Sequence, residues 1–316
     1  MTRTIWLASY PKSGNTWFRM LVANLSAKDK PADINDLPER GGIASARGPF
    51  DYLTLIDSGL LSHDEIDSLR PRVYEELASG AQDDEYDKLE DTLPARFVKV
   101  HDAYTRTAKG EALLGGRLGA DGAIVIVRDP RDVAPSLANY NRVDIDKAIA
   151  QINDREVAYC ARPERQDVQL RQKLPSWSGH VASWLDQTDI PVHLIRYENL
   201  QADTAAVFRA ALAFAGRPVT DEEISRAVAY ADFAELRRQE QEKGFRETPR
   251  RPGGLFFRRG EVGAWRDELT AEQVARIEAA HGLMMRRLGY ELTGGLPLAR
   301  AGEAAVLRNA SMEKTA

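Results

Sequence analysis

The chain has 316 residues, of which 43% are hydrophobic and 29% are charged. This composition is typical of a globular protein with a sizeable buried core, and it excludes a disordered or fibrous chain. The formal net charge of −5 argues against a general nucleic-acid-binding surface, because such surfaces carry a basic excess that neutralises phosphates. The single cysteine, Cys160, leaves no intrachain disulfide and favours a reducing compartment.

The N-terminal residues do not resemble a secretory signal, because Pro11 and Lys12 interrupt the apolar stretch that begins at Ile5. No apolar run in the sequence approaches the roughly 20 residues needed to cross a bilayer. We therefore expect a cytoplasmic protein that has no membrane partner.

Four short apolar runs have the length and β-branched content of buried parallel strands. They span residues 5–8, 97–100, 123–127 and 192–195. Helical spacing of apolar residues begins at Gly14 and recurs at residues 132–140, 176–187, 204–215 and 270–288. Strands that alternate with helices imply right-handed crossovers and a parallel sheet. The sequence thus predicts an α/β fold with a central parallel β-sheet flanked by helices.

Two polar stretches interrupt this alternation. Residues 28–95 predict loops and peripheral helices, and residues 239–263 predict a loop with Gly and Pro that stays mobile until something binds it. The tail after Thr293 has little apolar content. We expect a single domain over residues 1–293, followed by a flexible C-terminal tail over residues 294–316.

The first polar loop that follows a strand is suited to hold a phosphate. We call residues 10–17, Tyr-Pro-Lys-Ser-Gly-Asn-Thr-Trp, the phosphate loop. Ligands of open α/β sheets collect at the carboxyl ends of the strands, and free N–H groups at a helix start favour an anion. Lys12 adds a positive charge. Because Lys12 precedes Gly14 and a second Gly is missing, this is not the standard ATPase loop.

Arg128 and Ser136 form a second candidate phosphate site. Arg128 follows the third strand, and Ser136 lies eight residues later on a helix whose first turn suits Pro130. An arginine at a strand tip and a serine two turns into the next helix can reach one phosphate. A surface ion pair between Arg128 and Asp132 is the alternative, but it leaves Ser136 unexplained.

Two adjacent arginines, Arg258 and Arg259, lie in a Gly-containing loop near the C-terminus. Such a loop is suited to close over an anion. Taken alone, these arginines are better explained as solvated surface charges. We call residues 257–265 the closing loop.

The three motifs, in this order and at these separations, resemble the PAPS-dependent sulfotransferase family of the cytosolic type, from Ile5 to about Leu288. The phosphate loop resembles the family's 5′-phosphosulfate loop, with Asn15 where Thr is usual. The closing loop resembles Arg-Lys-Gly-x-x-Gly-x-Trp, with Arg259 in place of Lys and Ala264 in place of the commoner Asp. The resemblance implies a P-loop-like sulfotransferase fold, 3′-phosphoadenosine-5′-phosphosulfate (PAPS) as sulfuryl donor, PAP as product and no required metal.

The resemblance also implies roles for individual residues. Lys12 would contact the bridging and sulfuryl oxygens. The residues implied for the 5′-phosphate are Ser13, Gly14, Asn15 and Thr16, and those for the 3′-phosphate are Arg128, Ser136, Arg258, Arg259 and Gly260. Trp17, Tyr197 and Phe233 would contact the adenine, although Ala231 stands where the family often has a Thr.

His101, at the tip of the second predicted strand, is the best candidate for a general base. Its ordinary pKa leaves it largely neutral at cytoplasmic pH, and the resemblance places the catalytic His in an equivalent Lys-x-His. Lys99 would accompany it as a second cation near the transferred group. The sequence has no cluster with metal-ligand spacing, so we expect no metal.

Two other functions remain open at this point. A P-loop nucleotide or small-molecule kinase would also use a phosphate loop and clustered arginines, and a non-catalytic nucleotide-binding protein would keep the fold without the chemistry. The acceptor is expected to be a hydroxyl-bearing small molecule, such as a phenol, alcohol, lipid or natural product. The protein is expected to be a monomer or a homodimer, and residues 266–275 match only part of the family's dimer segment.

Overall fold

A computed structural model describes residues 2–37, 42–79, 95–162, 167–248 and 254–294. Its centre is a four-stranded sheet of β1 (Arg3–Ser9), β2 (Ala95–Val100), β3 (Gly122–Val127) and β6 (Val192–Arg196). The strand order is β2-β1-β3-β6 and all three pairings are parallel. The predicted α/β class and its four strands are confirmed. Of the predicted tail over residues 294–316, all but Gly294 lies outside the described residues.

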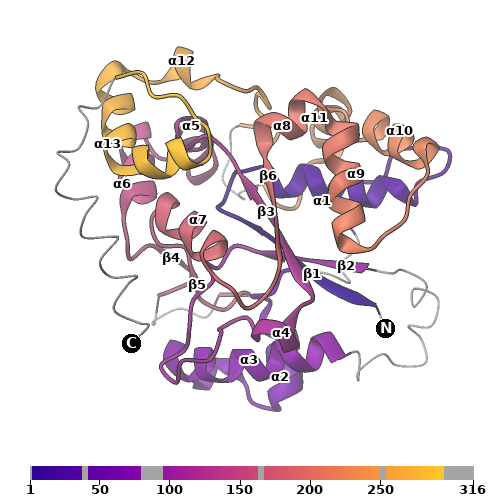
Figure 1. Cartoon of the computed structure of the whole chain (residues 1–316), viewed down its shortest axis with the longest axis vertical. Helices are drawn as coiled ribbons and strands as arrows, with labels where there is room; N and C mark the ends of the chain where they lie inside the picture. The colour runs from indigo at the N-terminus through magenta and orange to yellow at the C-terminus, as the bar shows by residue number, and fades with distance from the viewer. Residues whose placement is uncertain (1, 38–41, 80–94, 163–166, 249–253, 295–316) are drawn as a thin grey trace, which may run out of the picture.

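Helices cover both faces of this sheet (Figure 1). In β1, Ile5 and Leu7 pack into one core and Trp6 and Ala8 into the other, as the two-residue period of a strand requires. The first core contains α1 (Asn15–Leu25), α9 (Thr204–Ala215), α10 (Asp221–Tyr230) and part of α11 (Phe233–Lys243). The second contains α5 (Pro130–Asn141), α6 (Ile145–Asn153), α7 (Trp177–Leu185) and α13 (Ala271–Arg287).

The remaining elements lie around the sheet and its covering helices. They are α2 (Arg47–Thr54), η1 (Ser58–Leu60), α3 (His63–Ser79), α4 (Gly116–Gly119), the antiparallel pair β4 (Ala158–Tyr159) and β5 (Gln172–Lys173), α8 (Tyr197–Ala202) and α12 (Trp265–Glu268). The loops and peripheral helices predicted for residues 28–95 are confirmed where the structure describes them. Within the described ranges, no helix is both long and apolar enough to cross a membrane.

The stretch predicted as a loop over residues 239–263 differs at its start. Residues 239–243 continue α11, where Glu240 is buried. Its carboxylate accepts hydrogen bonds from the Thr248 hydroxyl and from the backbone N–H groups of Phe256 and Phe257, at 2.6 to 2.8 Å. The polar sequence predicted a mobile loop, but one buried carboxylate satisfies these donors and ties Thr248, Phe256 and Phe257 to α11.

The strand register positions the functional edge of the sheet. Ala8 pairs with Val100, Ser9 with Ile126, and Val127 with Arg196. The four strands therefore end almost level with one another. As a result, the phosphate loop, His101, Arg128 and Tyr197 leave the sheet at the same edge.

Candidate active site

The phosphate loop curls tightly between β1 and α1. Lys12 and Gly14 both have positive φ, at 70° and 107°. A Cβ added to Gly14 would lie 2.6 Å from the ring of Tyr197, so both the backbone and the close approach require glycine here. No side chain caps α1 at this end, which leaves its first N–H groups free to bind an anion.

Two residues of the phosphate loop turn their side chains away from the cavity. Asn15 donates through Nδ2 to the carbonyl of Leu7 at 2.9 Å and to Ser9 Oγ at 3.2 Å, so it secures the loop to β1. A contact from Asn15 to a phosphate would therefore come from its peptide N–H. Ser13 is fully buried, and its Oγ makes no hydrogen bond within the described part of the chain.

Lys12 lies between two aromatic rings. Its Nζ is 3.5 Å from the ring centroid of Phe256 and 4.4 Å from that of Tyr140. Burial, together with the neighbouring cations Lys99 and Arg128, lowers the pKa of Lys12 to about 7. An anion that binds beside this amine would restore its positive charge.

Lys99, the second predicted catalytic cation, is paired with a carboxylate that the sequence motifs did not point to. Glu247 Oε2 accepts hydrogen bonds from Lys99 Nζ at 3.2 Å and from Thr16 Oγ1 at 3.1 Å. Glu247 Oε1 accepts from Arg19 Nη1 at 2.5 Å. These cations hold the pKa of Glu247 down at about 2 despite its burial. The carboxylate therefore stays charged at neutral pH.

His101 is held in one tautomer by its surroundings. Its Nδ1 lies 2.8 Å from the carbonyl oxygen of Ser9, and because a carbonyl can only accept, Nδ1 carries the proton. His180 donates through Nε2 to the backbone oxygen of His101 at 3.1 Å. Burial and the charge of Lys99 lower the pKa of His101 to about 3. The imidazole is thus neutral, with its lone pair on Nε2.

Arg128 joins the phosphate loop to the closing loop. Its Nη2 donates to the carbonyl of Glu261 at 2.9 Å, and Nη1 lies 3.5 Å from the carbonyl of Lys12. The guanidinium carbon is 4.5 Å from the ring centroid of Tyr197. Its buried Nε makes no hydrogen bond within the described residues. The alternative explanation, an ion pair between Arg128 and Asp132, is not found among the contacts of the described residues, where Asp132 binds backbone N–H groups.

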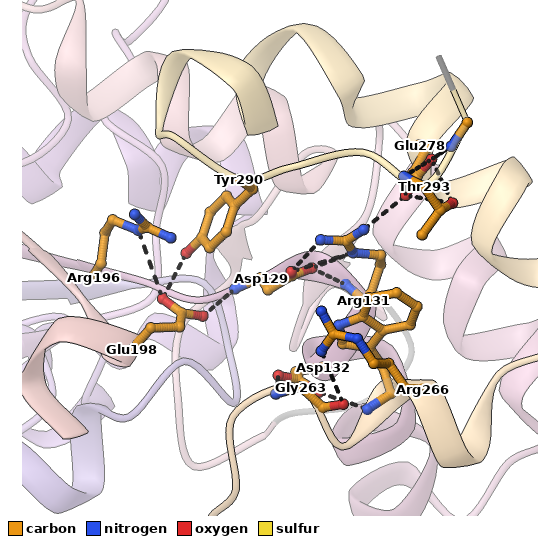
Figure 2. Close-up of polar contacts among 12 residues, drawn as sticks. Asp129, Arg131, Asp132, Arg196, Glu198, Gly263, Arg266, Glu278, Tyr290 and Thr293 are labelled. Carbon is orange, nitrogen blue, oxygen red and sulfur yellow. Dashed lines mark hydrogen bonds and ion pairs between the residues drawn. The ribbon is translucent and has the colours of Figure 1, made fainter. Parts of the chain in front are cut away.

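Figure 2 shows how buried carboxylates fix the start of α5 and the closing loop. Asp132 accepts from the backbone N–H groups of Gly263 and Trp265, at 2.7 and 2.9 Å. Arg131 binds Asp129 and Glu278, each at 2.7 Å. The first turn of α5 is therefore tied both to α13 and to the closing loop. This role of Asp132 was not evident from the sequence, because backbone partners leave no motif.

Both arginines of the closing loop are paired with carboxylates, Arg258 with Glu268 and Arg259 with Glu261. Arg258 forms two hydrogen bonds with Glu268, at 2.6 and 2.8 Å, and Arg259 lies 2.7 Å from Glu261. Gly260 has a φ of 68°, and an added Cβ would meet the ring of Phe233 at 2.4 Å. Both arginines are partly exposed, so their carboxylate partners hold them weakly enough to be exchanged for a phosphate.

The predicted adenine-contacting residues also lie together. Trp17 donates through Nε1 to the carbonyl of Ala231 at 3.0 Å, and its ring packs edge-on against Tyr197 at 5.7 Å. Tyr197 donates its hydroxyl proton to the carbonyl of Gly260 at 2.8 Å. Phe233 begins α11 beside Gly260. These three aromatic side chains come from three different elements, α1, α8 and α11.

One cavity of about 400 Å³ joins these groups. Every predicted site residue except Ser13 lines it, namely Lys12, Gly14, Asn15, Thr16, Trp17, Lys99, His101, Arg128, Ser136, Tyr197, Phe233, Arg258, Arg259 and Gly260. Among the described residues, no group of three or more His, Cys, Asp or Glu side chains is arranged to hold a metal ion.

Comparisons with known proteins agree on one family. A sulfotransferase-domain model matches residues 122–289, more than half of the chain. Cytosolic sulfotransferase 17 of Arabidopsis thaliana is 24% identical over 290 residues, which cover 88% of this chain and 72% of that protein. Human sulfotransferase 2B1 is 25% identical over 295 residues, which cover 89% of this chain and 66% of that protein.

Two solved structures of similar fold contain PAP. Mouse sulfotransferase SULT7A1, solved with PAP, has a TM-score of 0.55 and 18% identity, over 98% of this chain and 89% of that one. Retinol dehydratase, solved with androsterone and PAP, has a TM-score of 0.53 and 20% identity, over 92% of this chain and 82% of that one. At these identities the likeness establishes the fold. Together with the family match, it identifies the chain as a member of the sulfotransferase family, an enzyme that transfers sulfuryl groups.

Proposed function

We propose that this enzyme transfers a sulfuryl group from PAPS to a hydroxyl of a small-molecule acceptor and releases PAP, with His101 as general base. The observation that carries the proposal is the single cavity into which two separate phosphate-binding groups and a neutral histidine all open. Two phosphate sites on one nucleotide select a 3′-phosphorylated donor over ATP. The PAP bound by the structural relatives is consistent with this choice.

The residues around the cavity suit such a donor. The uncapped start of α1 and Thr16 offer N–H and hydroxyl donors to a 5′-phosphate. For a 3′-phosphate, Arg128 has a buried Nε with no hydrogen bond in the described residues, and Ser136 lines the same cavity. When bound, the donor supplies the sulfur that an acceptor oxygen attacks and the 5′-phosphate that leaves.

His101 has the geometry of a general base. The hydrogen bond from Nδ1 to Ser9 directs the lone pair of Nε2 away from β1, and the residue lines the cavity. As the acceptor oxygen forms its bond to sulfur, Nε2 takes the hydroxyl proton. The bond between sulfur and the 5′-phosphate oxygen breaks, and its electron pair leaves with the phosphate. Because the pKa of His101 is about 3, the negative charge of the bound sulfuryl donor must raise this pKa before the imidazolium form is stable.

The two lysines stabilise charge during transfer. Lys12 neutralises the charge that develops on the departing 5′-phosphate, and Lys99 lies beside the transferred group. Both are largely shielded from water, which strengthens their effect. Catalysis then depends mainly on positioning and on electrostatic stabilisation, as in phosphoryl transfer.

The acceptor side of the cavity has aromatic walls from Tyr140, Tyr159 and Phe256. These walls favour a small organic hydroxyl compound, and a phenol, alcohol, lipid or natural product would all meet that description. We further propose that the enzyme works in the cytoplasm as a monomer or homodimer without a nucleic-acid partner, in keeping with its net charge of −5.

The test combines binding with turnover. PAP and ATP·Mg²⁺ are titrated into the protein by calorimetry, and tight binding of ATP without binding of PAP would indicate a kinase instead. An acceptor panel is then screened with radiolabelled PAPS, with mass analysis of the products. His101→Ala is expected to abolish turnover while PAP still binds. Near-normal turnover by this variant would remove His101 from its role.

A further inference from the structure

Glu247 lies in the middle of the groups assigned to the donor's 5′ end. Its carboxylate receives Thr16 Oγ1, Lys99 Nζ and Arg19 Nη1, at 2.5 to 3.2 Å. Three donors from two elements, α1 and β2, surround the two carboxylate oxygens in the way that a protein surrounds a phosphate or sulfate group. The side chain of Glu247 is 26% exposed, so it is largely enclosed by this cluster.

The Glu247 carboxylate would compete with the bound sulfuryl donor for two of these groups, the Thr16 hydroxyl and the Lys99 ammonium. Thr16 has a single hydroxyl proton, and the structure commits that proton to Glu247. If the proton is to reach a 5′-phosphate oxygen, it must leave the carboxylate. Lys99 has three protons and can be shared, but a carboxylate and a phosphosulfate beside one ammonium repel each other.

The turn that precedes Glu247 is tied to Asn35 by two exposed hydrogen bonds, whereas Phe245 and Thr248 hold the chain on either side of it. Gly244, at the end of α11, accepts through its carbonyl from Asn35 Nδ2 at 2.9 Å, and the backbone N–H of Arg246 donates to Asn35 Oδ1 at 2.8 Å. Both bonds are exposed to water, which can replace them at little cost. Gly244 has a φ of 72°, and an added Cβ would meet no atom within 4 Å, so the chain is loosely packed at this residue.

We propose that Glu247 is an internal occupant of the 5′-phosphosulfate subsite, which the donor displaces when it binds, so that this residue sets donor affinity. The proposal rests on the function assigned above. Glu247 then acts as a specificity determinant as well, because only a ligand with enough negative charge at its 5′ end can replace the carboxylate. A nucleoside that lacks the 5′ charge gains nothing from the cations that Glu247 covers.

Glu247→Gln is the most direct test, since it keeps the size of the side chain and removes its charge. We expect PAP to bind at least about tenfold more tightly, because a like charge within about 4–6 Å of an ionised group disfavours that group by roughly one pKa unit or more, and one unit is a factor of ten. Adenosine 3′-monophosphate, which lacks the 5′-phosphate, should bind with unchanged affinity. Glu247→Ala should behave like Glu247→Gln.

A matched control is Glu242→Gln, which removes the same charge from an exposed carboxylate on α11 that pairs with Arg238. It should leave both affinities as in the wild type. Calorimetry gives the dissociation constants, and thermal melting confirms that each variant is folded. PAP binding that is unchanged or weaker in Glu247→Gln overturns the proposal, as does equal tightening of adenosine 3′-monophosphate. If the wild type and every variant fail to bind PAP, the donor assignment itself is wrong.

Discussion

Binding of PAP should be coupled to the uptake of a proton by Lys12. Burial between Phe256 and Tyr140 lowers the pKa of its amine to about 7. A bound 5′-phosphate would bring the pKa back towards the ordinary value of 10.5. At pH 8, roughly 0.9 of a proton per site is missing before binding and is recovered on binding. Above pH 7, PAP affinity should therefore fall as pH rises, approaching tenfold per pH unit.

The measurement is calorimetric titration with PAP at pH 8 in buffers of different ionisation enthalpy, whose slope gives the number of protons taken up. PAP phosphates are fully ionised at this pH and contribute nothing. Lys12→Met should bind PAP more weakly and lose the proton uptake. This result would show that the proton is taken up by Lys12 and not by Lys99, whose pKa is also lowered. Titration of the wild type without proton uptake, or uptake that persists in Lys12→Met, would refute this account of the site.

Two further predictions concern the backbone around the cavity. Gly14→Ala should lower the free energy of unfolding by roughly 1–3 kcal/mol and abolish PAP binding, because the new Cβ meets the ring of Tyr197 at 2.6 Å. The control is Gly110→Ala, where φ is also positive but the space around the new Cβ is open, so that only the cost of backbone strain is expected. Urea unfolding and calorimetry compare the two, and equal costs would contradict the steric reasoning. Asp132→Asn should weaken PAP binding about tenfold, because it loosens the closing loop that Asp132 anchors. Asp36→Asn, at an exposed carboxylate, should leave PAP binding unchanged. An unchanged dissociation constant for Asp132→Asn would show that this anchor is dispensable.

Much of the fold could be predicted because buried parallel strands are nearly continuous apolar runs. The four expected runs became β1, β2, β3 and β6, and residues 204–215 became α9 with the expected ends. Residues 239–243 were harder, because α11 has a polar sequence and buries only a few side chains. Its helical structure depends on tertiary contacts such as those of Glu240, which no local pattern reveals.

The candidate site was predictable to the extent that its chemistry is local. The phosphate loop, Arg128 and His101 each directly follow a strand, and the parallel sheet brings strand ends together. Asn15 shows the limit, since its amide could have faced either the ligand or β1, and only the packed structure turns it toward Leu7.

The sequence by itself determined the order of strands and helices, the residue types at each strand end and the resemblance to a sulfotransferase, because all of these are written in short segments. Only the tertiary structure decided the tautomer of His101, the anchoring of the closing loop by Asp132 and the presence of Glu247 among the site's cations. Glu247 is separated from Lys99 by 148 positions and from Thr16 by 231. Charges that far apart along the chain interact only because folding places them within hydrogen-bonding distance.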